Sequence, residues 1–159
     1  MRQLSEKLLS LDDVVSCAES LKAKNKTVVT TNGCFDILHR GHVQYLNEAR
    51  QLGDFLIVGL NSDSSVQKLK GTNRPINNQE DRQYCLAGLA SVDVVFIFEE
   101  ATPVEWLKKI KPHIHVKGED YKGKNIPEKI IETWGGILKF IPFVPGKSTT
   151  ATIEQLKRI

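Results

Sequence analysis

Two histidines and a glycine, His39-Arg40-Gly41-His42, stand where a predicted helix begins. A strand-like stretch (26–30) and the turn-like segment TNGCFDIL (31–38) precede them, and a helix-like stretch (43–52) follows. The backbone N–H groups at a helix N-terminus are unpaired and carry partial positive charge, so they bind anions. His39 and His42 are three residues apart, so they share a face of a helical turn and can donate to the same anion. The pattern predicts a strand, a tight glycine turn and a helix start that hold the phosphates of a nucleotide.

Five apolar runs of strand length alternate with helical segments along the chain. The runs are continuously apolar, which is typical of strands covered on both faces. The predicted strands are 27–30, 55–60, 94–98, 113–116 and 137–140; the predicted helices are 11–24, 43–52, 80–89, 104–110, 128–134 and 150–158. This order predicts an α/β fold, a doubly wound (Rossmann-like) parallel five-stranded sheet with helices on both faces. We expect a single domain over 1–159, in which 1–25 form an N-terminal helical extension.

Composition excludes several classes of protein. The net charge of +3 is spread along the chain and dense basic clusters with aromatics are missing, which argues against nucleic acid as a partner. No apolar run approaches the roughly 20 residues that span a membrane, and the N-terminus has no apolar signal core. Three cysteines without a C-x-x-C pair favour a reducing compartment, so we expect a cytoplasmic protein without zinc or disulfides.

Polar residues follow most of the predicted strands. In doubly wound sheets, ligands bind beyond the carboxyl ends of the strands. We therefore expect one composite site from the segments 32–42, 61–63, 117–121 and 146–150. In the last segment, Ser148, Thr149 and Thr150 begin the closing helix, where their hydroxyl and N–H groups can hold β- and γ-phosphates as well as cap the helix.

Several basic residues have both a functional and a structural interpretation. The polar segment 62–78 reads as one long loop, which is either a functional flap or a connector. Its Lys68, Lys70 and Arg74 either close over a reacting phosphate or form a solvated face. Arg82 opens a helix, where the macrodipole disfavours a cation, so its position suggests an anion nearby.

The acidic and amide residues also have two interpretations each. Asp36 either helps to hold Mg²⁺ or accepts hydrogen bonds from turn amides. Asn61 and Asp63 either bind sugar hydroxyls or make an Asx turn. Cys34 is expected to pack as a small residue, and His113 and His115, which flank a strand with no ligand-spaced partner, are expected to be structural.

The assembled motifs resemble the nucleotidyltransferases with an H-x-G-H signature and a late Ser-Thr-Thr segment. The chain is most similar to the bacterial D-glycero-β-D-manno-heptose 1-phosphate adenylyltransferases, which are often fused to a heptose kinase. The resemblance runs from residue 30 onward through GCFDILH (33–39), VGLNSD (58–63), LKGTNRP (69–75), EDR (80–82), VKGEDY (116–121) and PGKSTT (145–150).

The resemblance implies that ATP and heptose 1-phosphate give ADP-heptose and pyrophosphate, with Mg²⁺ as cofactor, for lipopolysaccharide or another surface glycan. It implies catalytic roles for His39, His42 and Lys70. It implies nucleotide contacts from Asn32, Gly33, Cys34, Phe35, Gly41, Lys117, Gly118, Glu119, Asp120, Ser148, Thr149 and Thr150. Asn61, Asp63, Lys68, Arg74 and Arg82 would face the sugar phosphate, and Asp36 would be the metal ligand.

Two departures keep alternatives open. Related glycerol 3-phosphate cytidylyltransferases carry an R-x-x-G-I-S-T-T tail, whereas Phe143 and Lys147 occupy the arginine and isoleucine positions here. This favours a purine nucleotide over the alternative, a cytidylyltransferase for glycerol 3-phosphate or a similar polyol or ethanolamine phosphate. A non-catalytic nucleotide-binding module is a third hypothesis. The kinase half of the fused relatives is missing from this sequence, so we expect a separate heptose kinase, and a homodimer is the expected assembly.

Overall fold

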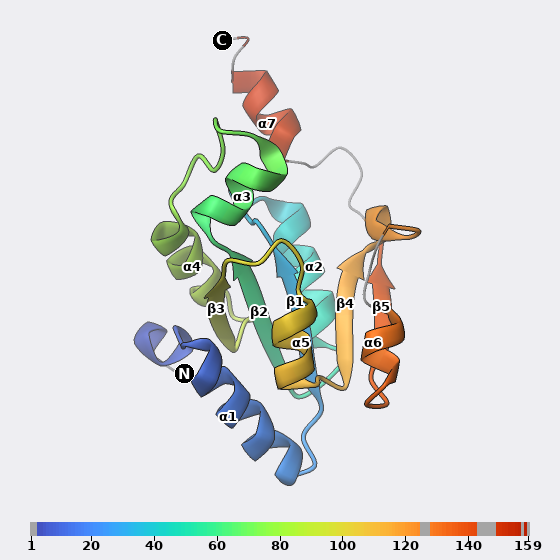
Figure 1. The fold of residues 1–159 in the computed structure, drawn as a ribbon. Helices are drawn as coiled ribbons and strands as arrows, with labels where there is room; N and C mark the ends of the chain where they lie inside the picture. The colour runs from blue at the N-terminus through green and yellow to red at the C-terminus, as the bar shows by residue number, and fades with distance from the viewer. Residues whose placement is uncertain (1–2, 125–127, 143–148, 157, 159) are drawn as a thin grey trace.

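Five parallel strands form one sheet in the computed structural model of the chain, which describes residues 3–124, 128–142, 149–156 and 158 (Figure 1). The strands are β1 (Val28–Gly33), β2 (Phe55–Asn61), β3 (Val94–Phe98), β4 (Ile114–Gly118) and β5 (Ile137–Ile141). Their spatial order is β3-β2-β1-β4-β5, with Val29 of β1 opposite Leu56 on one side and Ile114 on the other. The predicted doubly wound sheet is confirmed.

Helices cover both faces of this sheet. They are α1 (Leu11–Ala23), α2 (Arg40–Arg50), α3 (Asp63–Lys70), α4 (Gln79–Ala87), α5 (Val104–Ile110), α6 (Glu128–Glu132) and α7 (Thr149–Leu156), with 3-10 turns at Leu4–Lys7 and Glu119–Tyr121. Alternate residues of a strand point to opposite faces, so Leu56 and Val58 of β2 pack in the core under α2 and α4. Phe55 and Ile57 pack in the other core, under α1, α5 and α6.

The structure corrects the prediction of a loop over 62–78, because α3 occupies 63–70. The Ser62 side chain accepts a hydrogen bond from the Ser65 N–H and caps the helix, and Val66 is buried. A helix of eight residues with two large apolar side chains leaves little periodicity to detect in a polar sequence. Lys68 and Lys70 therefore lie in the last turn of a helix rather than in a flexible loop.

β5 differs from the predicted strand that is covered on both faces. It lies at an edge of the sheet and pairs with β4. Within it only Ile141 is buried, and Ile137 is 54% exposed. The strand ILKFI carries the exposed Lys139 at its centre, and a lysine on an edge strand is common because it discourages pairing with another chain.

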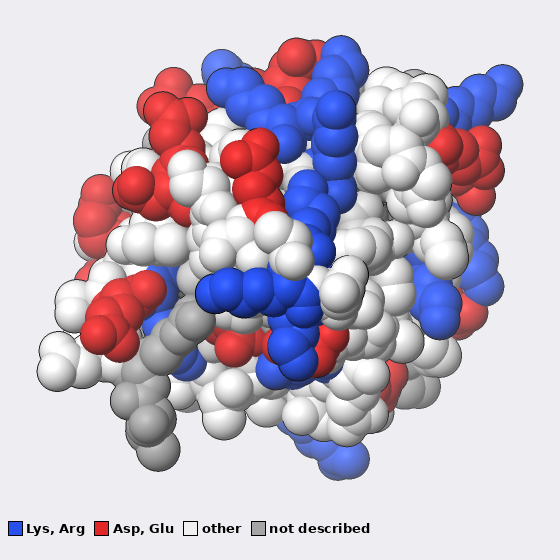
Figure 2. All heavy atoms as spheres, turned by 90° about the horizontal axis from the view of Figure 1, so that it is seen from below, with Lys and Arg blue, Asp and Glu red and all other residues white. Residues whose placement is uncertain are grey.

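The carboxyl ends of all five strands point toward the end of the molecule at which α3 and α7 lie (Figure 1). The strand order reverses between β1 and β4, which is where ligands bind in doubly wound sheets. Figure 2 shows the opposite end, where basic and acidic side chains both occur. No helix among the described residues is long and apolar enough to cross a membrane.

Candidate active site

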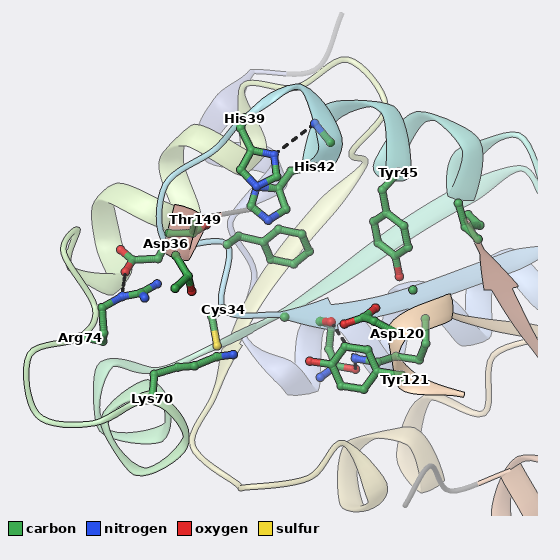
Figure 3. A pocket seen from close by; sticks show the side chains of 18 of the residues that line it. Cys34, Asp36, His39, His42, Tyr45, Lys70, Arg74, Asp120, Tyr121 and Thr149 are labelled. Atoms are coloured by element: carbon green, nitrogen blue, oxygen red, sulfur yellow. Dashed lines mark hydrogen bonds and ion pairs between the residues drawn. The ribbon is translucent and has the colours of Figure 1, made fainter. Parts of the chain in front are cut away.

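A cavity of about 240 Å³ opens at the carboxyl ends of β1 and β4 (Figure 3). Its walls come from the β1–α2 turn, the start of α2, the end of α3, the end of β4 and the start of α7. The lining residues are Asn32, Gly33, Cys34, Phe35, Asp36, His39, Gly41, His42, Tyr45, Lys70, Arg74, Lys117, Gly118, Asp120, Tyr121, Ile141, Pro142, Thr149 and Thr150. Described residues of three of the four expected segments, 32–42, 117–121 and 146–150, thus meet at this cavity, whereas the segment 61–63 does not line it.

The two histidines are held in different ways. His39 is the N-cap of α2, and its Nδ1 accepts the Gly41 N–H at 3.1 Å. A neutral His39 ring therefore carries its proton on Nε2. The His42 ring stacks on His39 with 3.8 Å between ring centroids. Burial and the neighbouring His39 lower the pKa of His42 to about 4, so His42 is neutral at pH 7. An anion here would meet N–H donors and a helix N-terminus rather than two imidazolium cations.

The turn between β1 and α2 is made by a phenylalanine rather than by a glycine. Phe35 has a φ of 44°, and its ring packs edge-on against His42 at 5.3 Å between centroids. Gly33 is needed for another reason, because a Cβ there would lie 3.0 Å from the Phe35 ring. A left-handed backbone at a non-glycine residue costs free energy and is typical of functional turns.

Asp36 ties this turn to the segment after α3. Its carboxylate accepts hydrogen bonds from the Arg74 Nε at 2.6 Å, the Ile76 N–H at 2.8 Å and the Asn77 N–H at 3.0 Å. Although burial opposes it, these amides and Arg74 hold the pKa of Asp36 below its ordinary value. Of its two predicted roles, the geometry favours bonding to amides over holding a metal, because these donors occupy the lone pairs of both oxygens. The amides belong to residues 76 and 77, not to the turn itself.

Arg82, predicted to face the sugar phosphate, is not among the residues that line the two cavities of the site. Its side chain is 0% exposed and pairs with Asp63 at 2.8 Å. The guanidinium also donates to the carbonyls of Cys34, Asn61 and Asn77. The anion beside Arg82 is therefore Asp63 of the protein itself. Arg82 also ties the backbone at Cys34 and Asn61, two residues that line the cavities, to Asn77.

Lys117 connects the ends of β4 and β1. Its Nζ donates to the carbonyl and Oδ1 of Asn32 at 3.1 and 3.2 Å, and it lies 4.2 Å from the centre of the Tyr121 ring. Burial lowers the pKa of Lys117 to about 8, although Asp120 opposes this shift. This ammonium group is thus held rigidly at the point where the sheet order reverses.

The residues after Lys117 divide between the cavity and the solvent. A Cβ on Gly118 would lie 2.5 Å from the Asp120 Oδ1, so glycine is needed for the packing of this turn. Asp120 lines the cavity. Glu119, for which a nucleotide contact is predicted, pairs with Lys122 at 2.6 Å on the exposed side and is not among the lining residues.

A second cavity, of about 200 Å³, adjoins the first. The two share Asn32, Gly33, Cys34, Lys70, Lys117 and Tyr121, and the second adds Asn61, Leu69, Ala101, Thr102, Pro103 and His115. Lys70 reaches from the end of α3 toward Cys34 at their common wall (Figure 3). Burial raises the pKa of the Cys34 thiol, despite the nearby cations, so the thiol stays neutral at pH 7.

Thr149 and Thr150 line the first cavity from the start of α7, and the Thr149 hydroxyl donates to the Ile37 carbonyl at 3.3 Å. Ser148, Phe143 and Lys147 lie outside the described residues. Lys68, predicted to face the sugar phosphate, lines a separate hollow together with Glu99 and Glu100 and neither of the two cavities described above.

Sequence reasoning missed several lining residues. Tyr45 lies one helical turn after His42, so its place on the same face could have been predicted. Ile141 and Pro142 end β5, and residues 101–103 follow β3 closely. The carboxyl-end rule applied to all five strands would have found them. His115 gave no signal beyond its type.

Comparisons with known proteins show which proteins this chain is similar to. The cytidylyltransferase-like family model matches residues 30–158. The bifunctional protein HldE of Aliarcobacter butzleri is 56% identical over 148 residues, covering 93% of this chain and 30% of that protein. HldE of Campylobacter concisus is 54% identical over 151 residues, covering 95% of this chain and 31% of that protein. The chain thus spans about a third of the length of the curated relatives that it matches.

Solved structures show the same fold. The lipopolysaccharide core biosynthesis protein from Thermoplasma volcanium has a TM-score of 0.61 at 28% identity, covering 75% of this chain and 97% of that one. A pantoate-beta-alanine ligase from Francisella tularensis, complexed with beta-gamma ATP and beta-alanine, has a TM-score of 0.64 at 15% identity, covering 96% and 79%. From the family match over 30–158 and the H-x-G-H segment at the head of α2, the chain belongs to the cytidylyltransferase-like family.

Proposed function

We propose that the chain is a nucleotidyltransferase that transfers AMP from ATP to D-glycero-β-D-manno-heptose 1-phosphate. The products are ADP-heptose, a precursor of lipopolysaccharide or another surface glycan, and pyrophosphate. One observation carries the proposal: His39 and His42 begin α2 at a cavity that joins a second cavity beside Lys70 and Lys117. The whole-chain resemblance and the HldE relatives favour heptose 1-phosphate as the acceptor.

In this proposal the first cavity takes ATP. The start of α2 and the two histidines donate to the β- and γ-phosphates, and Thr149 and Thr150 approach from the start of α7. The Gly118 and Asp120 wall then faces the nucleoside. The α-phosphate lies at the wall shared by the two cavities, within reach of the Lys70 and Lys117 ammonium groups.

The acceptor enters the second cavity, because it must reach the α-phosphate from the side opposite pyrophosphate. A phosphate oxygen of the sugar forms a bond to the α-phosphorus, and the bond from that phosphorus to the oxygen bridging to the β-phosphate breaks. Both reactants are anions, so catalysis consists of positioning and charge neutralisation. No covalent intermediate is needed, and the neutral thiol of Cys34 is not a nucleophile in this scheme.

Mg²⁺ belongs to the proposal as an ion carried by ATP, where it supplies charge neutralisation. The described residues do not offer it a ready site: Asp36 is occupied by N–H donors and Arg74, and no group of three His, Cys, Asp or Glu side chains is placed to hold a metal among them. Magnesium bound mainly by substrate phosphates needs few protein ligands.

In this proposal the chain forms one domain over 1–159, in which 1–25 are an N-terminal helical extension. The protein acts in the cytoplasm. A homodimer and a separate heptose kinase that supplies the sugar phosphate remain parts of it. The alternative is a cytidylyltransferase for glycerol 3-phosphate or a similar polyol or ethanolamine phosphate, which the HldE relatives support less.

The test is pyrophosphate release with a matrix of nucleoside triphosphates and phosphorylated acceptors in the presence of Mg²⁺. We expect release with ATP and heptose 1-phosphate, and little with CTP and glycerol 3-phosphate. The reverse preference would replace the proposal by the alternative. Nucleotide binding without release for any pair would leave a binding module.

A further inference from the structure

His115 is a buried polar residue that the proposed reaction has not used. It lies on β4, is 0% exposed and lines the second cavity. Its Nδ1 lies 2.9 Å from the Thr30 Oγ1, but its Nε2 has no hydrogen-bond partner within the described part of the chain. An unpaired buried nitrogen costs free energy, so it needs a reason in the structure.

The position of His115 supplies such a reason. His115 belongs to the wall that only the second cavity has, together with Asn61 and Thr102, and its ring packs edge-on against Trp106 behind that wall. These three side chains carry neutral polar groups, whereas the ammonium groups of Lys70 and Lys117 stand at the wall shared with the first cavity. A sugar phosphate has the same division, a charged phosphate at one end and neutral hydroxyls at the other.

The chemistry of the ring fits a hydroxyl better than a phosphate. Burial, with Lys117 nearby, keeps the pKa of His115 well below its ordinary value, so the ring is neutral. A neutral ring offers either a donor or an acceptor at Nε2, depending on the bond that Nδ1 makes with Thr30. A sugar hydroxyl can both donate and accept, so it satisfies Nε2 in either tautomer.

We propose that His115 is a specificity-determining residue whose Nε2 forms a hydrogen bond with a hydroxyl group of the sugar phosphate in the second cavity. This inference rests on the proposed function, since it names the hydrogen bond by which the protein recognises the sugar phosphate. When a site forms a hydrogen bond with a substrate hydroxyl, removing one of the two partners strongly weakens the binding of that substrate. We therefore expect that removing the His115 Nε2 weakens binding of the sugar phosphate and leaves binding of ATP unchanged.

Two substitutions separate the two ring nitrogens. His115→Asn places an amide near the Nδ1 position, which keeps a group for Thr30 but removes Nε2. His115→Gln places an amide near the Nε2 position. Trp106→Phe is the matched control. The Trp106 Nε1 is also buried without a partner among the described residues, but Trp106 does not line the second cavity. Its ring packs edge-on against His115 at 5.8 Å between centroids, and phenylalanine keeps an aromatic ring at that contact.

We expect His115→Asn to raise KM for the sugar phosphate at least roughly tenfold, the scale of one lost hydrogen bond, while KM for ATP stays within twofold. His115→Gln should recover most of the loss, and Trp106→Phe should leave both KM values unchanged. Deoxy sugar phosphates that lack the bonded hydroxyl should bind wild type weakly. The His115→Asn substitution should not weaken their binding further, because the hydrogen bond between Nε2 and the hydroxyl is already missing.

The wild-type protein gives a second readout that does not depend on a variant folding. In ¹⁵N-histidine NMR, the Nε2 resonance of His115 should shift when the sugar phosphate is added and stay in place when ATP alone is added. A sugar phosphate that binds without moving this resonance, or an unchanged acceptor KM in a folded His115→Asn, would overturn the assignment. Absence of turnover by wild type with any sugar 1-phosphate would instead overturn the proposed function and the inference with it.

Discussion

At the scale of single residues, the two histidines that look equivalent in sequence have different physical roles. His39 caps α2 through its Nδ1, whereas His42 packs between the rings of His39 and Phe35. The sequence predicts their shared face, because three-residue spacing decides it. A capping role is the structural interpretation of such histidines, and the structure assigns it to His39 although histidine is an unusual N-cap residue.

Substitution should separate these two roles. His42→Ala should lower turnover by roughly 100-fold, the usual effect of losing one preorganised donor to the transition state. His39→Ala should lower turnover similarly and also cost about 1 kcal/mol of stability through the lost cap. His39→Asn should restore the stability, since asparagine is a good N-cap, but not the turnover. Thermal unfolding and steady-state rates measure the two effects separately. Equal thermal stability of His39→Ala and His39→Asn would contradict the capping role.

Lys117 provides a pH signature for the site. Its pKa of about 8 means that it is charged below pH 8 and becomes neutral above it. The kcat/KM for ATP reports the free enzyme, so it should fall about tenfold for each pH unit above the pKa. The pKa values of the neighbouring Cys34 and Tyr121 are raised above their ordinary values, so these groups do not titrate between pH 7 and 9.

The control for this signature is Lys117→Met. Its kcat/KM for ATP should be low at every pH and should not change between pH 7 and 9. A wild-type profile that is flat up to pH 9.5 would show that the Lys117 charge does not contribute to ATP use.

At the scale of elements, α3 changes how the site is understood. The last turn of this helix fixes Lys70 at the wall shared by both cavities, so the lysine is prepositioned rather than carried by a closing loop. The composition of 62–78 could not reveal this, because the helix depends on the Ser62 cap and on burial of Val66 against the rest of the fold. Tertiary packing decides such short helices more than propensity does.

α3 also supplies a matched pair of lysines. Lys70→Ala should lower kcat by roughly 100-fold with only a few-fold change in ATP affinity, since its charge acts on the reacting phosphate. Lys68→Ala, in the same helical turn but beside Glu99 and Glu100, should change kcat less than twofold. Rates and calorimetric ATP binding measure both. Equal losses in the two variants would point to net charge of the helix rather than to the position of Lys70.

At the scale of the whole molecule, the strand order explains how much of the site sequence could predict. Parallel strands place their carboxyl ends at one edge, so Asn32, Asn61, Lys117 and Thr149 were expected to converge, and they line the two adjoining cavities. The directions of individual side chains could not be predicted. Arg82, which looks like a free cation at a helix start, forms an ion pair with Asp63, a residue 19 positions away in the sequence.

The central claim is direct transfer of AMP between two adjoining cavities, and ³¹P NMR of one reaction mixture tests it. With ATP, Mg²⁺ and heptose 1-phosphate, the account predicts a coupled pair of sugar diphosphate resonances together with pyrophosphate. It also predicts that labelled pyrophosphate exchanges into ATP only when the acceptor is present. Formation of ADP with a newly phosphorylated sugar, or exchange in the absence of acceptor, would contradict it.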